Sequence, residues 1–102
     1  MSSYAKGRRL EYRVRDLFRK NGFIVIRAAR SMPVDLVCMK NEKTLLIECK
    51  VRKSEFNETK RGELLNLATI AGAEAVLAYK NKRKIFLLDA KTNSHFLIED
   101  LF

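Results

Sequence analysis

The stretch VDLVCMKNEKTLLIECK, residues 34–50, decides the fold, because it contains two apolar runs separated by a short polar segment. Each run is long enough and rich enough in Val, Leu and Ile to predict a strand, and the polar segment at 41–43 predicts a tight turn. Two strands joined by such a turn pair as an antiparallel hairpin. Asp35 near the start of the first strand then lies roughly opposite Glu48 near the end of the second.

Charged residues interrupt the second strand of this hairpin. Because strand side chains alternate between two faces, Glu48 and Lys50 share one face while Ile47, Cys49 and Val51 take the other. Burying a charge in an apolar run costs several kcal/mol unless the charge is paired or bound to a metal. The sequence therefore indicates a functional site on the Glu48 face.

The rest of the chain alternates between helical and strand patterns. We expect a helix from 4 to about 21 that ends at Gly22, strands at 23–27, 33–39 and 44–51, a helix from Asn57 to about 71, and strands at 75–79 and 84–88. The second helix is apolar around much of its circumference, which predicts that it is largely buried. The apolar tail at 96–102 is expected to pack against the protein.

This order, αβββαββ, predicts an α/β fold with a mixed five-stranded sheet flanked by helices. The second helix would be the crossover between two parallel strands. A chain of 102 residues without a linker or repeat is expected to form a single domain, residues 1–102.

The net charge of +9 comes from 21 Lys and Arg residues against 12 Asp and Glu residues. Residues 1–61 carry 16 basic and 7 acidic side chains, whereas residues 62–102 carry 5 of each. Such an excess predicts a phosphate backbone or an anionic membrane as partner, with a merely solvated basic face as the alternative. Neither a secretory signal nor a membrane-spanning run is evident, so we expect an intracellular protein with no membrane partner.

The cysteines and the single histidine offer no zinc site. Cys38 and Cys49 lie in apolar strands without nearby ligands, which predicts buried, reduced thiols. His95 is alone near the tail and is expected at the surface or in a partner contact.

Asp35 and Glu48 can instead supply the oxygen ligands that Mg²⁺ prefers, with the backbone carbonyl of Cys49 as a further ligand. Acid should weaken metal binding by protonating the pair. Lys50 could orient a water or stabilise charge on a phosphate that is being cut. Glu11 lies at the edge of the first helix's apolar stripe, where an ion pair with Arg8 or Arg15 is the simpler interpretation.

A family resemblance extends over about residues 4–80. It rests on Lys6-Gly7, Glu11, Gly22-Phe23, Arg27, Ser31, Val34-Asp35-Leu36-Val37 and Ile47-Glu48-Cys49-Lys50. With these residues the chain resembles the archaeal Holliday-junction resolvases, which belong to the restriction-endonuclease-like nucleases. Two positions depart from the family pattern: Tyr12 stands where an Arg commonly follows the helix Glu, and Arg30 stands where the loop commonly has Gly.

The resemblance implies roles for particular residues. Glu11, Asp35 and Glu48 would serve the metal site, Lys50 the attacking water, and Ser31 would be an accessory active-site residue. Arg27 would contact the DNA backbone. The family also implies a homodimer, because a four-way junction is resolved only when two symmetric strands are cut.

We therefore expect a magnesium-dependent endodeoxyribonuclease, with Mn²⁺ as a possible substitute, that resolves four-way DNA junctions by paired nicks. Two alternatives remain: a nuclease for other branched or duplex DNA in repair, and a non-catalytic basic DNA-binding module. The predicted phosphate contacts all lie in the basic part of the chain, and they are Lys6, Arg8, Arg9, Arg27, Arg30, Arg52, Lys53, Lys60 and Arg61. No base-reading motif is evident, so recognition should depend on DNA shape.

Overall fold

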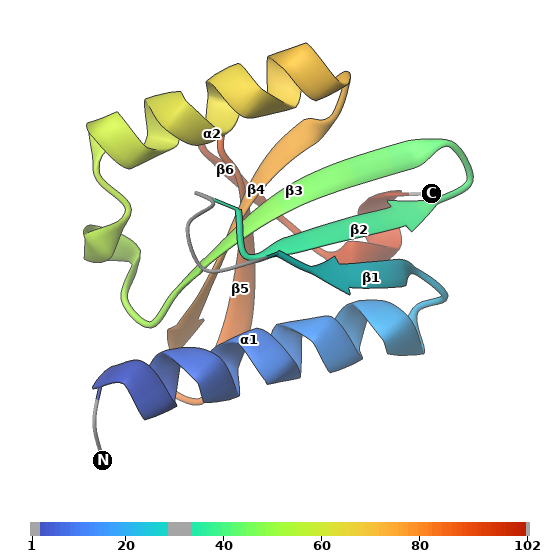
Figure 1. Ribbon diagram of the computed structural model, residues 1–102. Coiled ribbons are helices and arrows are strands. Elements are labelled where there is room, and N and C mark those ends of the chain that lie inside the picture. Colours follow the sequence, from blue (N-terminus) through green and yellow to red (C-terminus); the bar gives the residue numbers. More distant parts are fainter. Residues whose placement is uncertain (1–2, 29–33, 102) are drawn as a thin grey trace.

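A six-stranded mixed sheet with one long helix on each face forms the body of the protein (Figure 1). The computed structural model describes residues 3–28 and 34–101. Its elements are α1 (Ser3–Lys20), β1 (Ile24–Arg27), β2 (Leu36–Lys40), β3 (Lys43–Lys50), α2 (Glu58–Ala71), β4 (Glu74–Asn81), β5 (Lys84–Asp89) and β6 (Ser94–Phe96), with short 3₁₀ helices η1 (Lys53–Glu55) and η2 (Ile98–Leu101). Among the described residues, no helix has the length and apolarity needed to cross a membrane.

The predicted α/β class is confirmed, and the predicted strand count is wrong. The strands lie in the order β1-β2-β3-β4-β5-β6, and β3 pairs with β4 in parallel across the α2 crossover, as expected. The sixth strand, β6, adds only three residues to the edge of β5. Three residues are too few to show a period, so no pattern in the sequence predicts this strand. The tail behind it packs through Ile98, although Leu97 is exposed.

The central hairpin has the predicted pairing. Leu36 of β2 lies opposite Ile47 of β3, so the next pair outward is Asp35 and Glu48. The Asp35 N–H donates to the Ile47 carbonyl at 2.9 Å, which extends the pairing past the start of β2. The turn consists of two residues with positive φ, Asn41 (49°) and Glu42 (68°), and this conformation suits the twist of a hairpin. The first hairpin strand therefore starts at Leu36, later than the sequence pattern indicated.

Helix α1 covers one face of the sheet with a regular apolar stripe. Leu10, Val14 and Phe18 are buried in the main core. The helix ends where the Phe23 N–H donates to the Phe18 carbonyl at 3.0 Å and Gly22 takes a φ of 86°. The Phe18 and Phe23 rings meet edge to face at 5.0 Å between centroids. This C-cap arrangement fixes the direction in which β1 leaves the helix.

Helix α2 covers the other face less completely. Its N-cap is Asn57, as predicted, and Gly72 ends it with a φ of 65°. Only Leu64 and Ala68 are buried among its residues, and Ile70 is 75% exposed, so the expectation of a largely buried helix is wrong. The face of β3 beneath α2 changes from apolar to charged along its length, which leaves little for the helix to cover.

Both cysteines are free, as predicted, but only Cys38 is buried, and Cys49 is partly exposed. Burial raises the pKa of Cys38 to about 12. Burial also raises the pKa of Cys49 well above its ordinary value, and the charges of Asp35 and Glu11 add to this effect. Near neutral pH, in the absence of metal, both side chains are therefore thiols and not thiolates.

Candidate functional site

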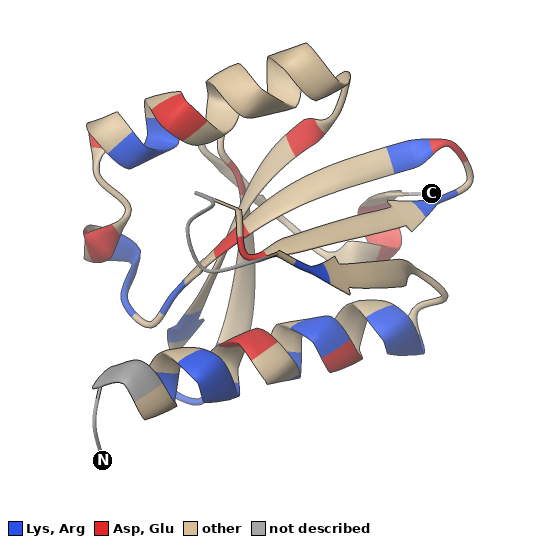
Figure 2. Cartoon of the chain, in the orientation of Figure 1, with Lys and Arg blue, Asp and Glu red and all other residues tan. Residues whose placement is uncertain are grey.

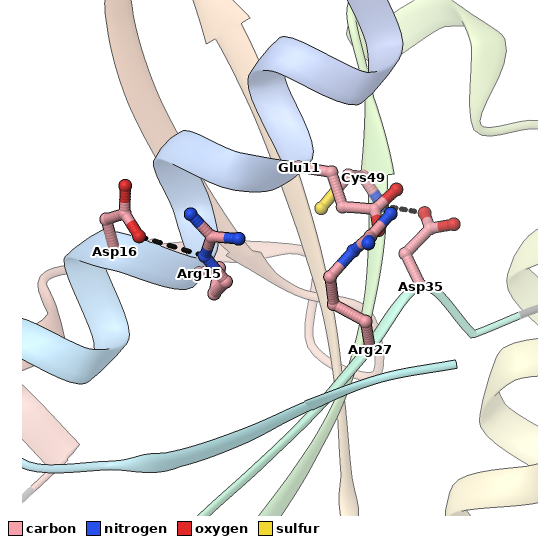
Figure 3. Close-up of polar contacts among 6 residues, drawn as sticks. All are labelled: Glu11, Arg15, Asp16, Arg27, Asp35 and Cys49. Atoms are coloured by element: carbon pink, nitrogen blue, oxygen red, sulfur yellow. Dashed lines mark hydrogen bonds and ion pairs between the residues drawn. The ribbon is translucent and has the colours of Figure 1, made fainter. Parts of the chain in front are cut away.

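Asp35 stands immediately before β2 and is fixed by the backbone of the neighbouring strand. Its Oδ2 accepts a hydrogen bond of 2.6 Å from the N–H of Cys49 (Figure 3). Burial raises the pKa of Asp35; the Cys49 hydrogen bond opposes this effect and the charge of Glu11 adds to it, so that the pKa lies above its ordinary value. The hydrogen bond places this carboxylate beside the β3 backbone, between Glu48 and Lys50.

Glu48 is the one buried charged residue in the described part of the chain, with 8% of its surface exposed. Burial raises its pKa, and the charge of Asp35 raises it further. Its Oε1 lies 3.3 Å from the Nζ of Lys50, which confirms that Glu48 and Lys50 share a face of β3. The ion pair stabilises Glu48 in a place where an unpaired carboxylate would be costly.

Glu11 reaches the same region from α1, but its carboxylate is paired with a different residue than expected. The Nε of Arg27 donates to Glu11 Oε1 at 2.7 Å, and Figure 3 shows the guanidinium of Arg27 turned toward Glu11. Sequence reasoning had suggested Arg8 or Arg15 as the partner. Arg15 pairs instead with Asp16 at 2.9 Å. The contact with Arg27 joins α1 to β1. Helical spacing predicts ion pairs only within one helix, so it could not have predicted this one.

Tyr12, one of the two positions that depart from the family pattern, lies between two arginines. The guanidinium carbons of Arg15 and Arg27 lie 4.7 and 4.8 Å from the centre of its ring. Such cation–π contacts are worth about 0.5–1 kcal/mol each at exposed sites. Tyr12 therefore brings no charge of its own to the site but holds Arg27 beside Glu11.

The predicted three-carboxylate metal site is only partly assembled. Within residues 3–28 and 34–101, no group of three or more His, Cys, Asp or Glu side chains lies close enough to hold an ion. Asp35 and Glu48 lie together, while Glu11 is held by Arg27. Ser31 and Arg30 fall outside the described residues. The carboxylate pair still suits a hard divalent cation, because a cation would offset the burial and mutual repulsion that raise both pKa values.

Lys60 belongs to this site, although the sequence indicated it only as a DNA contact. The nearby ammonium group of Lys50 lowers the pKa of Lys60. Burial lowers the pKa of Lys50, but the carboxylates of Glu48 and Asp35 oppose burial, and the pKa lies above its ordinary value. The charge of Lys60 also acts on Asp35 and Glu48, where it lowers both pKa values. The predicted helix start at Asn57 was the only sequence signal that could have placed Lys60 here.

Figure 2 shows basic positions along α1 and on the connection between β3 and α2, the two segments next to the site. Five of the predicted phosphate contacts are exposed on α1 and on the connection between β3 and α2, namely Lys6, Arg8, Arg9, Arg52 and Lys53. Arg13 and Lys80, which the sequence analysis omitted, line a small pocket together with Lys6 and Arg9. Their side chains could extend the phosphate-binding surface toward the end of β4.

Arg61 differs from the other predicted DNA contacts. Its Nε donates to the carbonyl of Ala90 at 2.6 Å and its Nη2 donates to the carbonyl of Lys91 at 3.1 Å. Its Nη1 also lies 3.6 Å from Glu58 Oε2. These contacts anchor the first turn of α2 to the segment after β5, so we assign Arg61 a structural role in this conformation.

The mixed sheet, the carboxylates on adjacent strands and the neighbouring lysine place the chain in the restriction-endonuclease-like class of α/β proteins. A sequence profile described as archaeal Holliday junction resolvase (hjc) matches residues 2–100. The chain belongs to the archaeal Holliday junction resolvase family.

Two relatives illustrate the similarity. The chain is 35% identical over 88 residues to the crossover junction endodeoxyribonuclease Hjc of Methanocaldococcus jannaschii, a match that covers 82% of this chain and 66% of the relative. The solved structure of Archaeoglobus fulgidus Hjc, a Holliday junction resolvase from an archaeal hyperthermophile, superposes with a TM-score of 0.73 at 29% identity. That match covers 84% of this chain and 74% of the solved one. The chain thus spans just under two thirds of the length of the curated relative.

Proposed function

We propose that the protein is a structure-selective, metal-dependent endodeoxyribonuclease that resolves four-way DNA junctions by paired symmetric nicks. The observation that carries this proposal is Glu48, a buried carboxylate paired with Lys50 and placed beside Asp35, whose own carboxylate is held by the Cys49 N–H. A module that only binds DNA has no use for two desolvated carboxylates facing a phosphate, because they would repel it. The names of the relatives support the same activity.

Asp35 and Glu48 would hold Mg²⁺, or Mn²⁺ in its place, together with the backbone carbonyl of Cys49 and an oxygen of the substrate phosphate. When bound, the cation supplies positive charge that polarises the phosphodiester and lowers the pKa of a nearby water. Glu11 could join these ligands only after leaving Arg27. A DNA phosphate that binds Arg27 offers such an exchange, since it replaces one anionic partner of the guanidinium with another.

Lys50 would assist hydrolysis through the charge of its ammonium group. In the reaction a water oxygen forms a new bond to phosphorus and one P–O ester bond breaks, which leaves a phosphate on one strand end and a hydroxyl on the other. The water loses its protons to solvent, and the leaving oxygen gains one. The Lys50 ammonium would stabilise the negative charge that grows on the phosphate oxygens during this exchange. Ser31 would assist as an accessory residue of the site.

A homodimer would supply the pairing of the cuts. Each chain provides one Asp35–Glu48 pair, so two chains related by a twofold axis would present two sites to the two strands that must be cut. The basic residues of α1 and of the β3–α2 connection would bind the phosphate backbone around each site. Recognition would rest on the shape of the junction, because phosphate contacts carry no base information.

The experiment compares labelled four-way junction, linear duplex and Y-shaped DNA, each incubated with magnesium or with chelator, using the wild-type chain and an Asp35→Asn variant. We expect paired nicks on the junction only, and only with metal and Asp35. Equal cutting of all three DNAs would indicate a general or repair nuclease and reject the resolvase function. Tight binding without cutting would indicate a basic DNA-binding module. Cutting that persists in chelator and in Asp35→Asn would reject the metal mechanism.

A further inference from the structure

The turn between β4 and β5 gathers basic side chains outside the candidate site. Four of the five basic residues in the stretch 62–102 fall within residues 80–84, and they are Lys80, Lys82, Arg83 and Lys84. All four are exposed. None of the five acidic residues of the stretch 62–102 lies among them. The even balance of charge in this part of the chain therefore contains a strongly positive turn.

The geometry of this turn does not call for basic residues. Lys82 and Arg83 form the two-residue turn, with φ angles of 49° and 70°, and the flanking residues Asn81 and Lys84 pair across the strands. Asn and Gly adopt this left-handed backbone at a lower cost than Lys and Arg. The turn at 41–42 has nearly the same φ angles but carries Asn and Glu. The two cations at the β4–β5 turn therefore require a reason other than the turn itself.

The charges of the turn are not compensated by neighbouring acids. Within residues 3–28 and 34–101, none of Lys82, Arg83 and Lys84 forms an ion pair. By contrast, Lys43 beside the other two-residue turn lies 3.0 Å from Glu74. Like charges on consecutive residues repel one another, and this repulsion falls when anionic groups bind next to them. The β4–β5 turn is therefore suited to a partner with several negative charges.

The turn lies at the same end of the sheet as the candidate site. Strands β3 and β4 are parallel, and Lys50 at the end of β3 lies opposite Tyr79. Lys82 comes three residues later, which is about 10 Å further along the strand direction. The Nη2 of Arg13 on α1 donates to the carbonyl of Arg83 at 2.9 Å and holds the turn beside the basic positions of α1 (Figure 2). The basic surface of α1 therefore continues onto the turn.

We propose that the β4–β5 turn binds the phosphate backbone of the junction arm in which the strand is cut, a few nucleotides from the cut. This inference rests on the proposed function, which supplies the DNA. Phosphates of one strand follow one another about every 3.4 Å along the helix axis, so about 10 Å corresponds to roughly three nucleotides. Lys82 and Arg83 add two phosphate contacts there, and these contacts position the arm without reading its bases.

The first test measures the Kd for a four-way junction at several salt concentrations, in chelator, so that binding is observed apart from cutting. The double variant Lys82→Asn/Arg83→Gly removes both charges and introduces Asn-Gly, the sequence that favours this turn. Its Tm should equal or exceed that of the wild type. The slope of log Kd against log salt should decrease by about two, since each phosphate contact contributes about 0.9, and Kd at low salt should rise roughly tenfold or more.

The matched control is Lys20→Gln/Lys91→Gln, which removes the same charge from two exposed lysines, one at the end of α1 and one after β5. It should keep the wild-type slope. Equal slopes for the turn variant and the control would overturn the inference. Lys82→Gln/Arg83→Gln keeps long side chains at the turn, and it should lose as much slope as the first variant. If this second variant keeps the wild-type slope, the inference is overturned as well.

A second measurement locates the contact on the DNA. Junctions are made with a single neutral methylphosphonate at successive positions along one arm. Neutralising the phosphates about three nucleotides from the cut should weaken binding of the wild-type chain but not of Lys82→Asn/Arg83→Gly. Wild type and variant that respond alike at every position would overturn the inference. If the wild-type chain fails to cut junctions but its turn variant still loses slope, the proposed function is overturned and the contact with DNA stands.

Discussion

The two faces of β3 differ in what they contribute. On the α1 face, Leu45, Ile47 and Cys49 continue an apolar core that Phe18 and its neighbours fill completely. On the α2 face, the strand passes from Leu46, which lies in the apolar cluster under α2, to Glu48, which is equally buried but is charged. The difference teaches that one strand can serve stability on one side and chemistry on the other.

The α1 face should carry the largest stability effect. Phe18 is fully buried and packs edge to face on Phe23, so Phe18→Ala should lower the free energy of unfolding by about 3–5 kcal/mol. Leu97→Ala, at a residue that is 65% exposed, is the control and should change it by about 0.5 kcal/mol or less. Denaturant unfolding measures both. Equal effects would show that the core is not where we place it.

The α2 face should show the opposite pattern, in which activity falls and stability does not. Asp35→Asn should slow junction cutting by roughly 100- to 1,000-fold, because it removes a charge on which metal binding depends. Asn can still accept the hydrogen bond from the Cys49 N–H, so the fold should persist. The metal-free variant should have a Tm equal to or above that of the wild type, since the buried charge is gone. A variant that unfolds would instead give Asp35 a structural role.

A smaller effect is expected where α2 begins. Asn57→Ala removes the cap on the Lys60 N–H and should cost about 1 kcal/mol of stability. Thr59→Ala, an exposed neighbour in the same turn, provides the comparison. If both variants behave alike in thermal unfolding, the cap contributes less than we infer.

The smallest effect should be a pH dependence that only the α2 face produces. The pKa of Glu48 is raised on folding, so the folded state binds its proton more tightly than the unfolded state does. This contribution to stability is therefore present in acid and is lost as pH rises from the ordinary carboxyl pKa of about 4 through the raised value. Glu48→Gln removes it. In metal-free protein, Glu48→Gln should have a higher free energy of unfolding than wild type at pH 7, and this difference should shrink as the pH is lowered. A difference that grows in acid would contradict the raised pKa of Glu48.

The sequence was sufficient for the features that depend on local patterns. Strand alternation placed Glu48 and Lys50 on one face, and the hairpin register placed Asp35 opposite Glu48. The amphipathic stripe of α1 and the Asn57 cap were also visible. Each of these follows from spacing along the chain, with no knowledge of the partner elements.

The features that could not be predicted from the sequence depend on contacts between distant elements. The pairing of Glu11 with Arg27 joins residues from α1 and β1, and the charge of Lys60 on α2 lowers the pKa values of Asp35 and Glu48 in the central hairpin. Spacing along the chain could not predict that the Arg61 guanidinium donates hydrogen bonds to two backbone carbonyls. The apolar composition of α2 suggested burial all round, but only one side of the helix, through Leu64 and Ala68, lies in the apolar cluster with the sheet.

The central claim is that paired carboxylate sites on a basic surface cut both strands of a junction. A supercoiled plasmid that extrudes a cruciform tests it most directly, because two coupled nicks across the junction convert the circle to linear DNA. With magnesium we predict linear product from the cruciform plasmid, no product from the same plasmid without the cruciform, and no product from the Asp35→Asn chain. Nicked circles alone, or equal cutting of the plasmid without the cruciform, would contradict the account.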